Sequence, residues 1–146
     1  MTTIPSDAFN LARFLEAQAA SYDAAIEELR AGQKRSHWMW YVFPQVAGLG
    51  SSAMAQKYAI ESREEARAYL DHPILGRRLQ DCAGALLQVE DRSAEQIMGS
   101  IDCAKLCSSM TLFTEVSQRG SVFERVLEKY YSGSRDERTI EFLRTK

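Results

Sequence analysis

The sequence lacks the features that would place the chain in a membrane, outside the cell or on a polyanion. No apolar run approaches the roughly 20 residues that a helix needs to span a bilayer. Cysteine occurs three times, an odd number, and no segment has the charged start and apolar core of a signal peptide. Eighteen Lys and Arg oppose twenty Asp and Glu, so the formal charge of -2 provides no large positive field. We therefore expect a cytoplasmic protein that binds neither duplex nucleic acid nor a membrane.

Known catalytic and metal-binding motifs are also missing. The sequence contains no GxSxG elbow, no GxxxxGK phosphate loop, no HExxH and no dinucleotide GxGxxG. Cys103 and Cys107 lie four residues apart, but no further ligand at suitable spacing completes a zinc site, so we interpret them as core thiols. Neither His37 nor His72 belongs to a metal motif. We predict no metal site and no cofactor.

Short helical patterns with clear boundaries make up most of what the sequence does contain. Apolar residues recur at three- and four-residue steps from Leu75 to Leu87, which predicts a central helix. Ser-x-x-Glu/Gln patterns at Ser62, Ser93 and Ser121 predict capping boxes. Further helix starts are expected at Ser6 or Asp7, Ser21, Ser36, Ser52, Asp102 and Asp136. We predict one compact all-α domain, residues 1–146, of about seven to eight short helices.

The segment KRSHWMWYVFPQ, residues 34–45, gathers cations and aromatic rings. Ser36 is placed to cap a short helix that begins at His37, where unpaired backbone N–H groups and the helix dipole favour an anion. Lys34 and Arg35, directly before that start, would reinforce the preference. His37 is a candidate acid or base near neutral pH, although no carboxylate in the local turn is positioned to orient it.

The two tryptophans of this segment are expected to point to different sides of the chain. In a helix, Trp38 and Trp40 do not share a face, so one suits the core and the other offers a stacking surface for a ring. Two interpretations remain open. The segment is either a buried aromatic plug preceded by solvated cations, or the wall of a binding site with Gln45 at its border.

A glycine-rich loop, VAGLGSS, follows Gln45. Gly48 and Gly50 allow the backbone to approach a ligand closely, and the Ser51 hydroxyl can donate a hydrogen bond. The loop lacks the preceding strand and following Lys of a nucleotide-binding loop. We treat it as a candidate element of a site.

A second polar group lies in IDCAKLCSSMTLF, residues 101–113. On a helix, Asp102, Lys105 and Ser109 form one polar row beside an apolar one. The row either lines a pocket, where a Ser and Lys pair can act as nucleophile and base, or has only structural roles. In the structural case, it comprises a cap, a surface cation paired with that cap, and a serine bonded to a helical carbonyl.

The chain closely resembles the bacterial family called domain of unknown function 1810, sometimes mislabelled calpastatin-like, in FNLARFLEAQ, KRSHWMWYVFPQVAGLGSS, YAIESREEARAYLDHPILGRRL and DCAKLCSSMTLF. The resemblance covers nearly the whole chain and implies a mainly α-helical cytosolic domain without an established activity. Polar signature positions in two separate segments are more typical of a pocket than of a core. The resulting ligand-binding candidates are Lys34, Arg35, Ser36, His37, Trp38, Trp40, Gln45, Gly48, Gly50, Ser51, Tyr58, Ser108 and Ser109, and the catalytic candidates are Asp102 and Lys105.

A second, fainter likeness concerns the helical N-glycosidases of the NADAR group. AQKYAIESREEARAYLDHPILGRRL, followed by SSM and by VLEKYYSG with a final short helix, is similar to that group in order and texture, without an aligned catalytic set. Members of the group act on ADP-ribose-type or phosphorylated ribosyl-amine substrates. The likeness implies a hydrolase of such substrates.

Three hypotheses about function follow. The first is a domain that binds a small anionic, nucleotide-like ligand between residues 34–45 and residues 102–110. The second is hydrolysis of an N-glycosidic bond, in which Asp102 positions water or stabilises an oxocarbenium-like charge. The third is a protein-interaction module with an exposed patch of Trp38, Trp40 and Tyr41, whose partner the sequence does not identify.

Overall fold

The helix boundaries follow the punctuation of the sequence across residues 7–145, the part of the chain that the computed structural model describes. Ten helices lie in this range, seven of them at least seven residues long, and the range contains no strand. The helices are α1 Ala12–Ala19, α2 Tyr22–Arg30, α3 Met39–Val42, α4 Ala53–Lys57, α5 Arg63–Asp71, α6 Leu75–Gln88, α7 Ala94–Met98, α8 Ser100–Glu115, α9 Val122–Tyr131 and α10 Glu137–Arg144. The predicted all-α class is confirmed.

In each of the three predicted capping boxes, the serine hydroxyl accepts the backbone N–H three residues later, as predicted. At Ser93 the full box forms, because the hydroxyl accepts the Gln96 N–H at 3.1 Å and the Gln96 side chain accepts the Ser93 N–H at 2.8 Å. At the starts of α5 and α9 the serine also accepts as predicted. The glutamate there takes the backbone N–H of the residue before the serine, so the reciprocal bond is absent from these two starts.

The helices predicted to begin at Ser36 and at Asp102 begin at other residues. The hydroxyl of Ser36 donates to Glu28 at 2.5 Å, and α3 begins three residues later than Ser36, at Met39. Asp102 lies inside the first turn of α8, because that helix already begins at Ser100. Its acidic charge still suits the positive end of the helix dipole.

Other predicted starts are found in part. Asp136 accepts the backbone N–H of Thr139 and caps α10. Asp7 accepts the backbone N–H groups of Leu11 and Ala12, but α1 begins only at Ala12, with Leu11 in the cap position, so Asp7 does not cap this helix. Ser52 caps α4. The hydroxyl of Ser21, which precedes α2, donates instead to the carbonyl of Ala17, and the alternative cap Ser6 lies outside the described residues.

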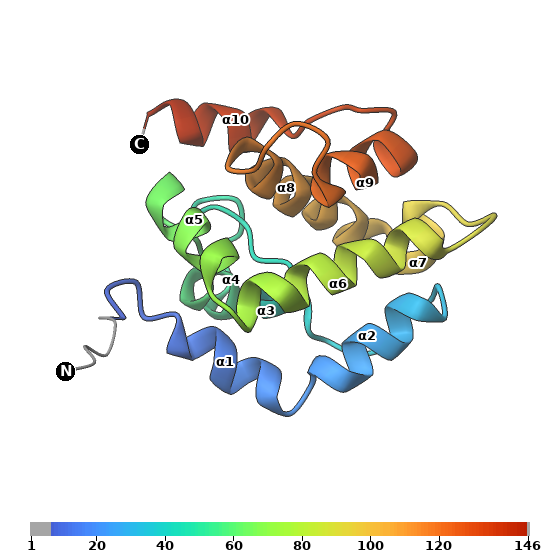
Figure 1. The fold of residues 1–146 in the computed structure, drawn as a ribbon, viewed down its shortest axis with the longest axis horizontal. Helices are drawn as coiled ribbons and strands as arrows, with labels where there is room; N and C mark the ends of the chain where they lie inside the picture. Colours follow the sequence, from blue (N-terminus) through green and yellow to red (C-terminus); the bar gives the residue numbers. More distant parts are fainter. Residues whose placement is uncertain (1–6, 146) are drawn as a thin grey trace.

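Helices α6 and α8 form the centre of the fold. α6 packs against α2, α5 and α9, and α8 packs against α5, α7, α9 and α10. Figure 1 shows α6 crossing the molecule between the α1–α2 pair and the group of α8, α9 and α10. Helix α6 is therefore the central helix that the apolar spacing predicted.

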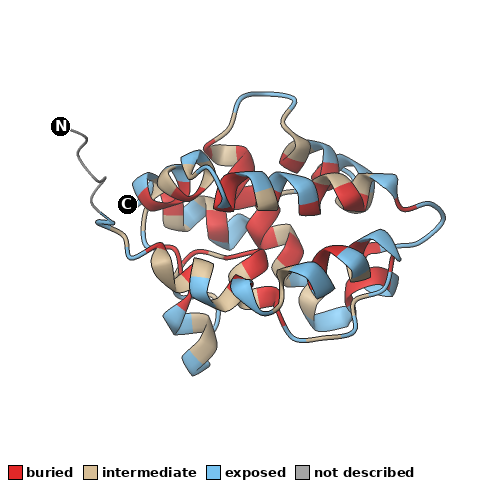
Figure 2. Cartoon of the chain, turned by 60° about the horizontal axis from the view of Figure 1, so that its bottom comes forward, coloured by how far each residue is buried: buried red, intermediate tan, exposed pale blue. Residues whose placement is uncertain are grey.

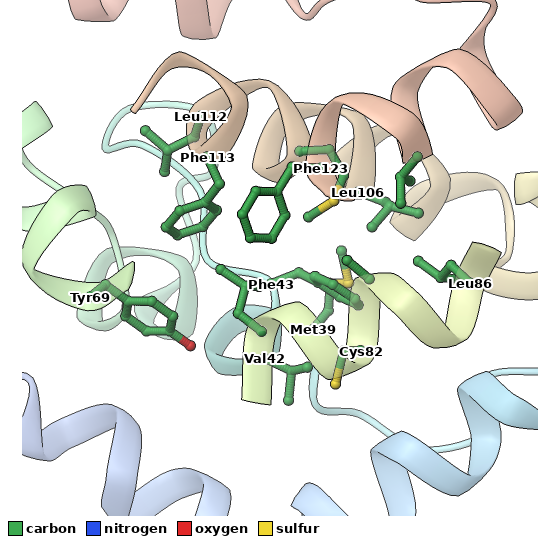
Figure 3. Close-up of a cluster of buried hydrophobic side chains, with 14 of the residues drawn as sticks. Met39, Val42, Phe43, Tyr69, Cys82, Leu86, Leu106, Leu112, Phe113 and Phe123 are labelled. Carbon is green, nitrogen blue, oxygen red and sulfur yellow. The ribbon is translucent and has the colours of Figure 1, made fainter. Parts of the chain in front are cut away.

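The core joins α3 to these central helices. Phe43, Phe113 and Phe123 converge beside Met39 between α6 and α8 (Figure 3), and all four are at most 2% exposed. Burial of each such side chain contributes about 1.5–3 kcal/mol relative to exposure. Buried residues lie mainly on the helix faces turned toward one another (Figure 2). These buried contacts hold the short helix α3 against the core, which fixes the position of Trp40 on the outer side of α3.

The cysteines divide between core and margin. Cys82 is fully buried in α6, and burial raises its pKa to about 12, so its thiol stays protonated. Cys103 and Cys107 are half-buried, which corrects the interpretation that both are core thiols.

Among residues 7–145, no group of three or more His, Cys, Asp and Glu side chains is arranged to hold a metal ion. Within the same range, each helix is too short or too polar to cross a membrane.

Candidate functional site

Two adjoining cavities lie along the loop between α3 and α4. The first, here the α3 cavity, encloses about 250 Å³ and is lined by residues that include Trp40, Gln45, Gly48, Gln56, Tyr58 and Glu61. The second, here the α8 cavity, encloses about 460 Å³, and its lining includes Gln45, Ser51, Lys105, Ser108, Asp136 and Arg138. Gln45, Gly50 and Ala55 line both cavities, so the two adjoin at these residues.

The loop between the cavities is held at both ends by backbone hydrogen bonds. The Ala47 N–H donates to the Ile60 carbonyl at 2.9 Å, and the Ile60 N–H donates to the Gln45 carbonyl at 2.8 Å. A Cβ atom added at Gly50 would lie 2.8 Å from the Ala55 Cβ, closer than real Cβ contacts. Glycine at this position therefore keeps the junction open.

Gln45 occupies the junction with its hydrogen-bonding capacity unused. Gln45 is half-buried, and its backbone carbonyl accepts the Ile60 N–H. No hydrogen bond to its side-chain amide occurs within the described residues. A half-buried amide with two free donors and a free acceptor is suited to a polar ligand that enters either cavity.

The cations of the α8 cavity come from two helices. The Lys105 ammonium lies 3.8 Å from Asp102 Oδ1 and 5.7 Å from the centre of the Trp40 ring. The Arg138 guanidinium donates a long hydrogen bond of 3.3 Å to the Gly48 carbonyl. Neither contact is a close ion pair, so both charges remain available to an anion.

Residues 34–38, which were predicted to bind a ligand, surround Glu28 instead. The Glu28 carboxylate accepts the Arg35 N–H at 2.7 Å, the Ser36 N–H at 2.9 Å, the Ser36 hydroxyl at 2.5 Å and the Trp38 indole N–H at 2.9 Å. Burial acts to raise the pKa of Glu28, but the hydrogen bonds from Ser36, Arg35 and Trp38 outweigh it and lower the pKa to about 2. One carboxylate therefore anchors this part of the segment.

Lys34 ties the same segment to α8. Its side chain is 7% exposed, and its ammonium lies 2.9 Å from Asp102 Oδ2. It also donates to the Ser36 carbonyl at 2.6 Å and lies 4.9 Å from the centre of a Trp38 ring. The cation that was expected to attract a ligand is thus enclosed between a carboxylate, a carbonyl and an aromatic face.

The structure divides the predicted residues into two sets. Those that line the cavities are Trp40, Gln45, Gly48, Gly50, Ser51, Tyr58, Lys105 and Ser108. Absent from both linings are Lys34, Arg35, Ser36, His37, Trp38, Asp102 and Ser109. Arg35 and His37 are exposed, whereas Trp38 and Ser109 are fully buried. Neither of the two cavities is lined by all of the predicted residues.

The polar row of α8 changes its surroundings along the helix. Asp102 and Lys105 are half-buried near the first turn, but Ser109 is fully buried where neighbouring helices cover the same face. The Ser109 hydroxyl has no hydrogen-bond partner among the described residues. Ser108, one position earlier, lines the α8 cavity and donates to the Ala104 carbonyl at 3.2 Å.

Several lining residues were not predicted from the sequence. Arg138 and Asp136 reach the α8 cavity because α10 packs against α8. Gln56 and Glu61 flank the α3 cavity from the segment around α4. Asp136 was recognised only as a cap, and the spacing of Arg138, Gln56 and Glu61 carries no signal of a site, because their proximity depends on tertiary packing.

The comparisons with known proteins concern the whole chain. No curated protein sequence matches it. The crystal structure of the conserved hypothetical protein Rv1873 from Mycobacterium tuberculosis is similar to it, with 54% identity and a TM-score of 0.93 over 94% of this chain and 99% of that chain. A family model described as Protein of unknown function (DUF1810) matches residues 8–143. Since that match spans nearly the full length, the chain belongs to the DUF1810 family, as its resemblance indicated.

Proposed function

We propose that the protein binds a small phosphate-bearing ligand in the α8 cavity. The observation that carries the proposal is the convergence of Lys105 from α8 and Arg138 from α10 on one cavity of about 460 Å³. This volume lies within the usual range for small-molecule sites. The Ser51 hydroxyl adds a donor to the same lining, whereas the Ser108 hydroxyl already donates to the Ala104 carbonyl. A guanidinium, an ammonium and a hydroxyl donor together suit phosphate oxygens.

The nearby carboxylates do not neutralise these cations. Asp136 also lines the cavity, but its Oδ2 atom accepts the Thr139 N–H at 3.0 Å and the Thr139 hydroxyl at 2.5 Å. Asp102 lies closer to Lys34, at 2.9 Å, than to Lys105, at 3.8 Å. Within residues 7–145, Arg138 forms no ion pair. An arriving anion therefore displaces only weak contacts of Lys105 and Arg138, and the single charge of Asp136 in the same lining reduces their attraction without cancelling it.

The geometry supports the other two hypotheses less well. Asp102, the proposed catalytic carboxylate, lies outside both linings and faces two lysines, so it has no free path to a bound substrate. The interaction hypothesis requires exposed aromatic rings, but Trp38 is 0% exposed and Trp40 and Tyr41 are half-buried. Binding of a small anion is accordingly the function that we propose.

Titration calorimetry with ribose 5-phosphate tests this proposal. We expect the wild-type protein to bind, and Lys105→Met and Arg138→Gln each to weaken binding by about tenfold or more, since each removes a charge-assisted hydrogen bond. Affinity should also fall as salt is added, because the site is open to solvent.

The matched control is Arg77→Gln, which removes an exposed cation from α6 outside both cavities. We expect this variant to bind within twofold of the wild type. Absence of binding to the wild type, or equal loss in all three variants, would contradict the proposal. Thermal unfolding of each variant confirms that the comparison is made on folded protein.

A further inference from the structure

The α3 cavity is too small to hold a whole ligand by itself. Its volume of about 250 Å³ lies below the usual range of about 300–1,000 Å³ for small-molecule sites. Its lining shares Gln45, Gly50 and Ala55 with the larger α8 cavity. A ligand whose phosphate lies in the α8 cavity can therefore extend past Gln45 and place one further group in the α3 cavity.

Trp40 supplies the α3 cavity with an aromatic surface. It is half-buried and lines the cavity, whereas the neighbouring Trp38 is fully buried with its indole N–H bonded to Glu28. The Lys105 ammonium, 5.7 Å from the Trp40 ring centre, lies near the outer limit for a cation–aromatic contact. The ring thus lines one cavity, and the neighbouring ammonium lines the other.

The other side chains of the α3 cavity suit the edge of a heterocycle. Gln45 has an unused amide, and Gln56 donates through its amide nitrogen to the Ser51 carbonyl at 2.9 Å, which leaves its carbonyl oxygen free to accept. Glu61 adds an exposed carboxylate. Amide and carboxylate groups of this kind pair with the N–H and ring-nitrogen edges of nucleobases.

We infer that the ligand is a nucleotide, with its base against Trp40 in the α3 cavity and its phosphate between Lys105 and Arg138 in the α8 cavity. The inference rests on the proposed function and assigns the chemical class of its ligand. Stacking on an aromatic side chain supplies affinity for any base, because each base presents a π-face. The free amide of Gln45 at the junction supplies the polar contact between the two parts.

The test compares adenosine 5′-monophosphate with ribose 5-phosphate, which differ by the base. We expect the wild-type protein to bind the nucleotide about tenfold or more tightly than the sugar phosphate, the usual effect of one stacked base. Trp40→Leu should reduce the affinity for the nucleotide to that for the sugar phosphate and leave the latter within twofold. Trp40→Phe, which keeps an aromatic face, should restore most of the difference.

Tryptophan fluorescence provides a readout that a loss of folding would not imitate. The nucleotide should quench emission in the wild type by stacking on Trp40, and the sugar phosphate should not. In Trp40→Phe the quenching should disappear while calorimetric binding of the nucleotide persists. Tyr22→Leu serves as a control, since it removes a half-buried ring of α2 outside both cavities and should change stability only.

The outcomes separate this inference from the proposed function. Equal affinity for both compounds, with dependence on Lys105 and Arg138, would overturn the inference and leave the phosphate site intact. Tighter nucleotide binding that survives Trp40→Leu would also overturn it. Absence of binding by either compound would overturn the proposed function, and the inference with it.

Discussion

Two tryptophans only two residues apart have opposite surroundings in this protein. Trp38 is 0% exposed, its indole N–H donates to Glu28 and Lys34 covers a face of its ring. Trp40 is half-buried and lines a cavity. The segment that holds both is therefore an anchor at one end and a surface facing a cavity at the other.

The polar groups around the two rings differ in the same way. On the Trp38 side, Glu28 accepts four hydrogen bonds and Lys34 forms a close ion pair with Asp102. On the Trp40 side, Lys105 and Gln45 hold only weak contacts or none among the described side chains. Satisfied buried groups contribute to stability, whereas unsatisfied groups at a cavity are available to a ligand. Substitutions on the two sides should accordingly affect different properties.

The largest expected effect is the loss of stability in Glu28→Ala. The substitution leaves the N–H groups of Arg35, Ser36 and Trp38 without their acceptor. We expect the free energy of unfolding to fall by about 3 kcal/mol, as for the loss of a charged hydrogen-bonding centre. Urea denaturation measures the change. Glu27→Ala, at the exposed neighbouring position, should change it by less than about 0.5 kcal/mol.

The low pKa of Glu28 adds a dependence on pH. The ordinary pKa of this carboxyl group is 4.5, and its pKa in the folded protein is about 2. The group therefore stabilises the fold above pH 4.5, and this contribution is lost as the pH falls toward 2. Asp7 and Glu124, whose pKa values are lowered by backbone N–H groups, act in the same direction. The difference in the free energy of unfolding between the wild type and Glu28→Gln isolates the contribution of Glu28. This difference should shrink as the pH falls from 4.5 to 2, and a constant difference would exclude this linkage.

A smaller effect is expected from the ion pair between Lys34 and Asp102. Lys34→Met and Asp102→Asn should each destabilise the protein by about 2 kcal/mol, with a coupling energy of about 1–2 kcal/mol in the double variant, because the pair is largely buried. The exposed pair of Arg144 and Glu141, at 3.5 Å, is the matched control, with an expected coupling below about 0.5 kcal/mol. Equal coupling energies in the two double-mutant cycles would contradict the prediction that the pair of Lys34 and Asp102 contributes more to stability than an exposed ion pair.

The sequence predicted the helices better than the surroundings of its polar residues. The spacing from Leu75 to Leu87 identified the central helix, and Ser93 with Gln96 identified a complete capping box. Both signals act over one or two helical turns, so local sequence suffices. Ser36 was misassigned as a cap because its actual partner, Glu28, lies eight residues away on another helix.

The site could be predicted only in part for the same reason. The Gly48 to Ser51 loop and Lys105 were identified from the sequence, and they line the cavities. Arg138 was not identified, since it reaches the cavity only through the packing of α10 on α8. Lys34 was placed in the ligand set because a cation before a helix favours an anion, but the carboxylate that satisfies it is Asp102, a residue of the same protein.

The smallest expected effects concern Arg35 and His37, which belong to the predicted set but are exposed and outside both cavities. Arg35→Ala keeps the backbone N–H that Glu28 accepts, and His37→Ala keeps the carbonyl that accepts the Tyr41 hydroxyl. Each should change stability by less than about 0.5 kcal/mol and ribose 5-phosphate affinity by less than twofold. A tenfold loss of affinity in Arg35→Ala, as expected for Lys105→Met, would mean that the ligand reaches past Trp38. The boundary between anchor and site would then lie earlier in the segment than Trp40.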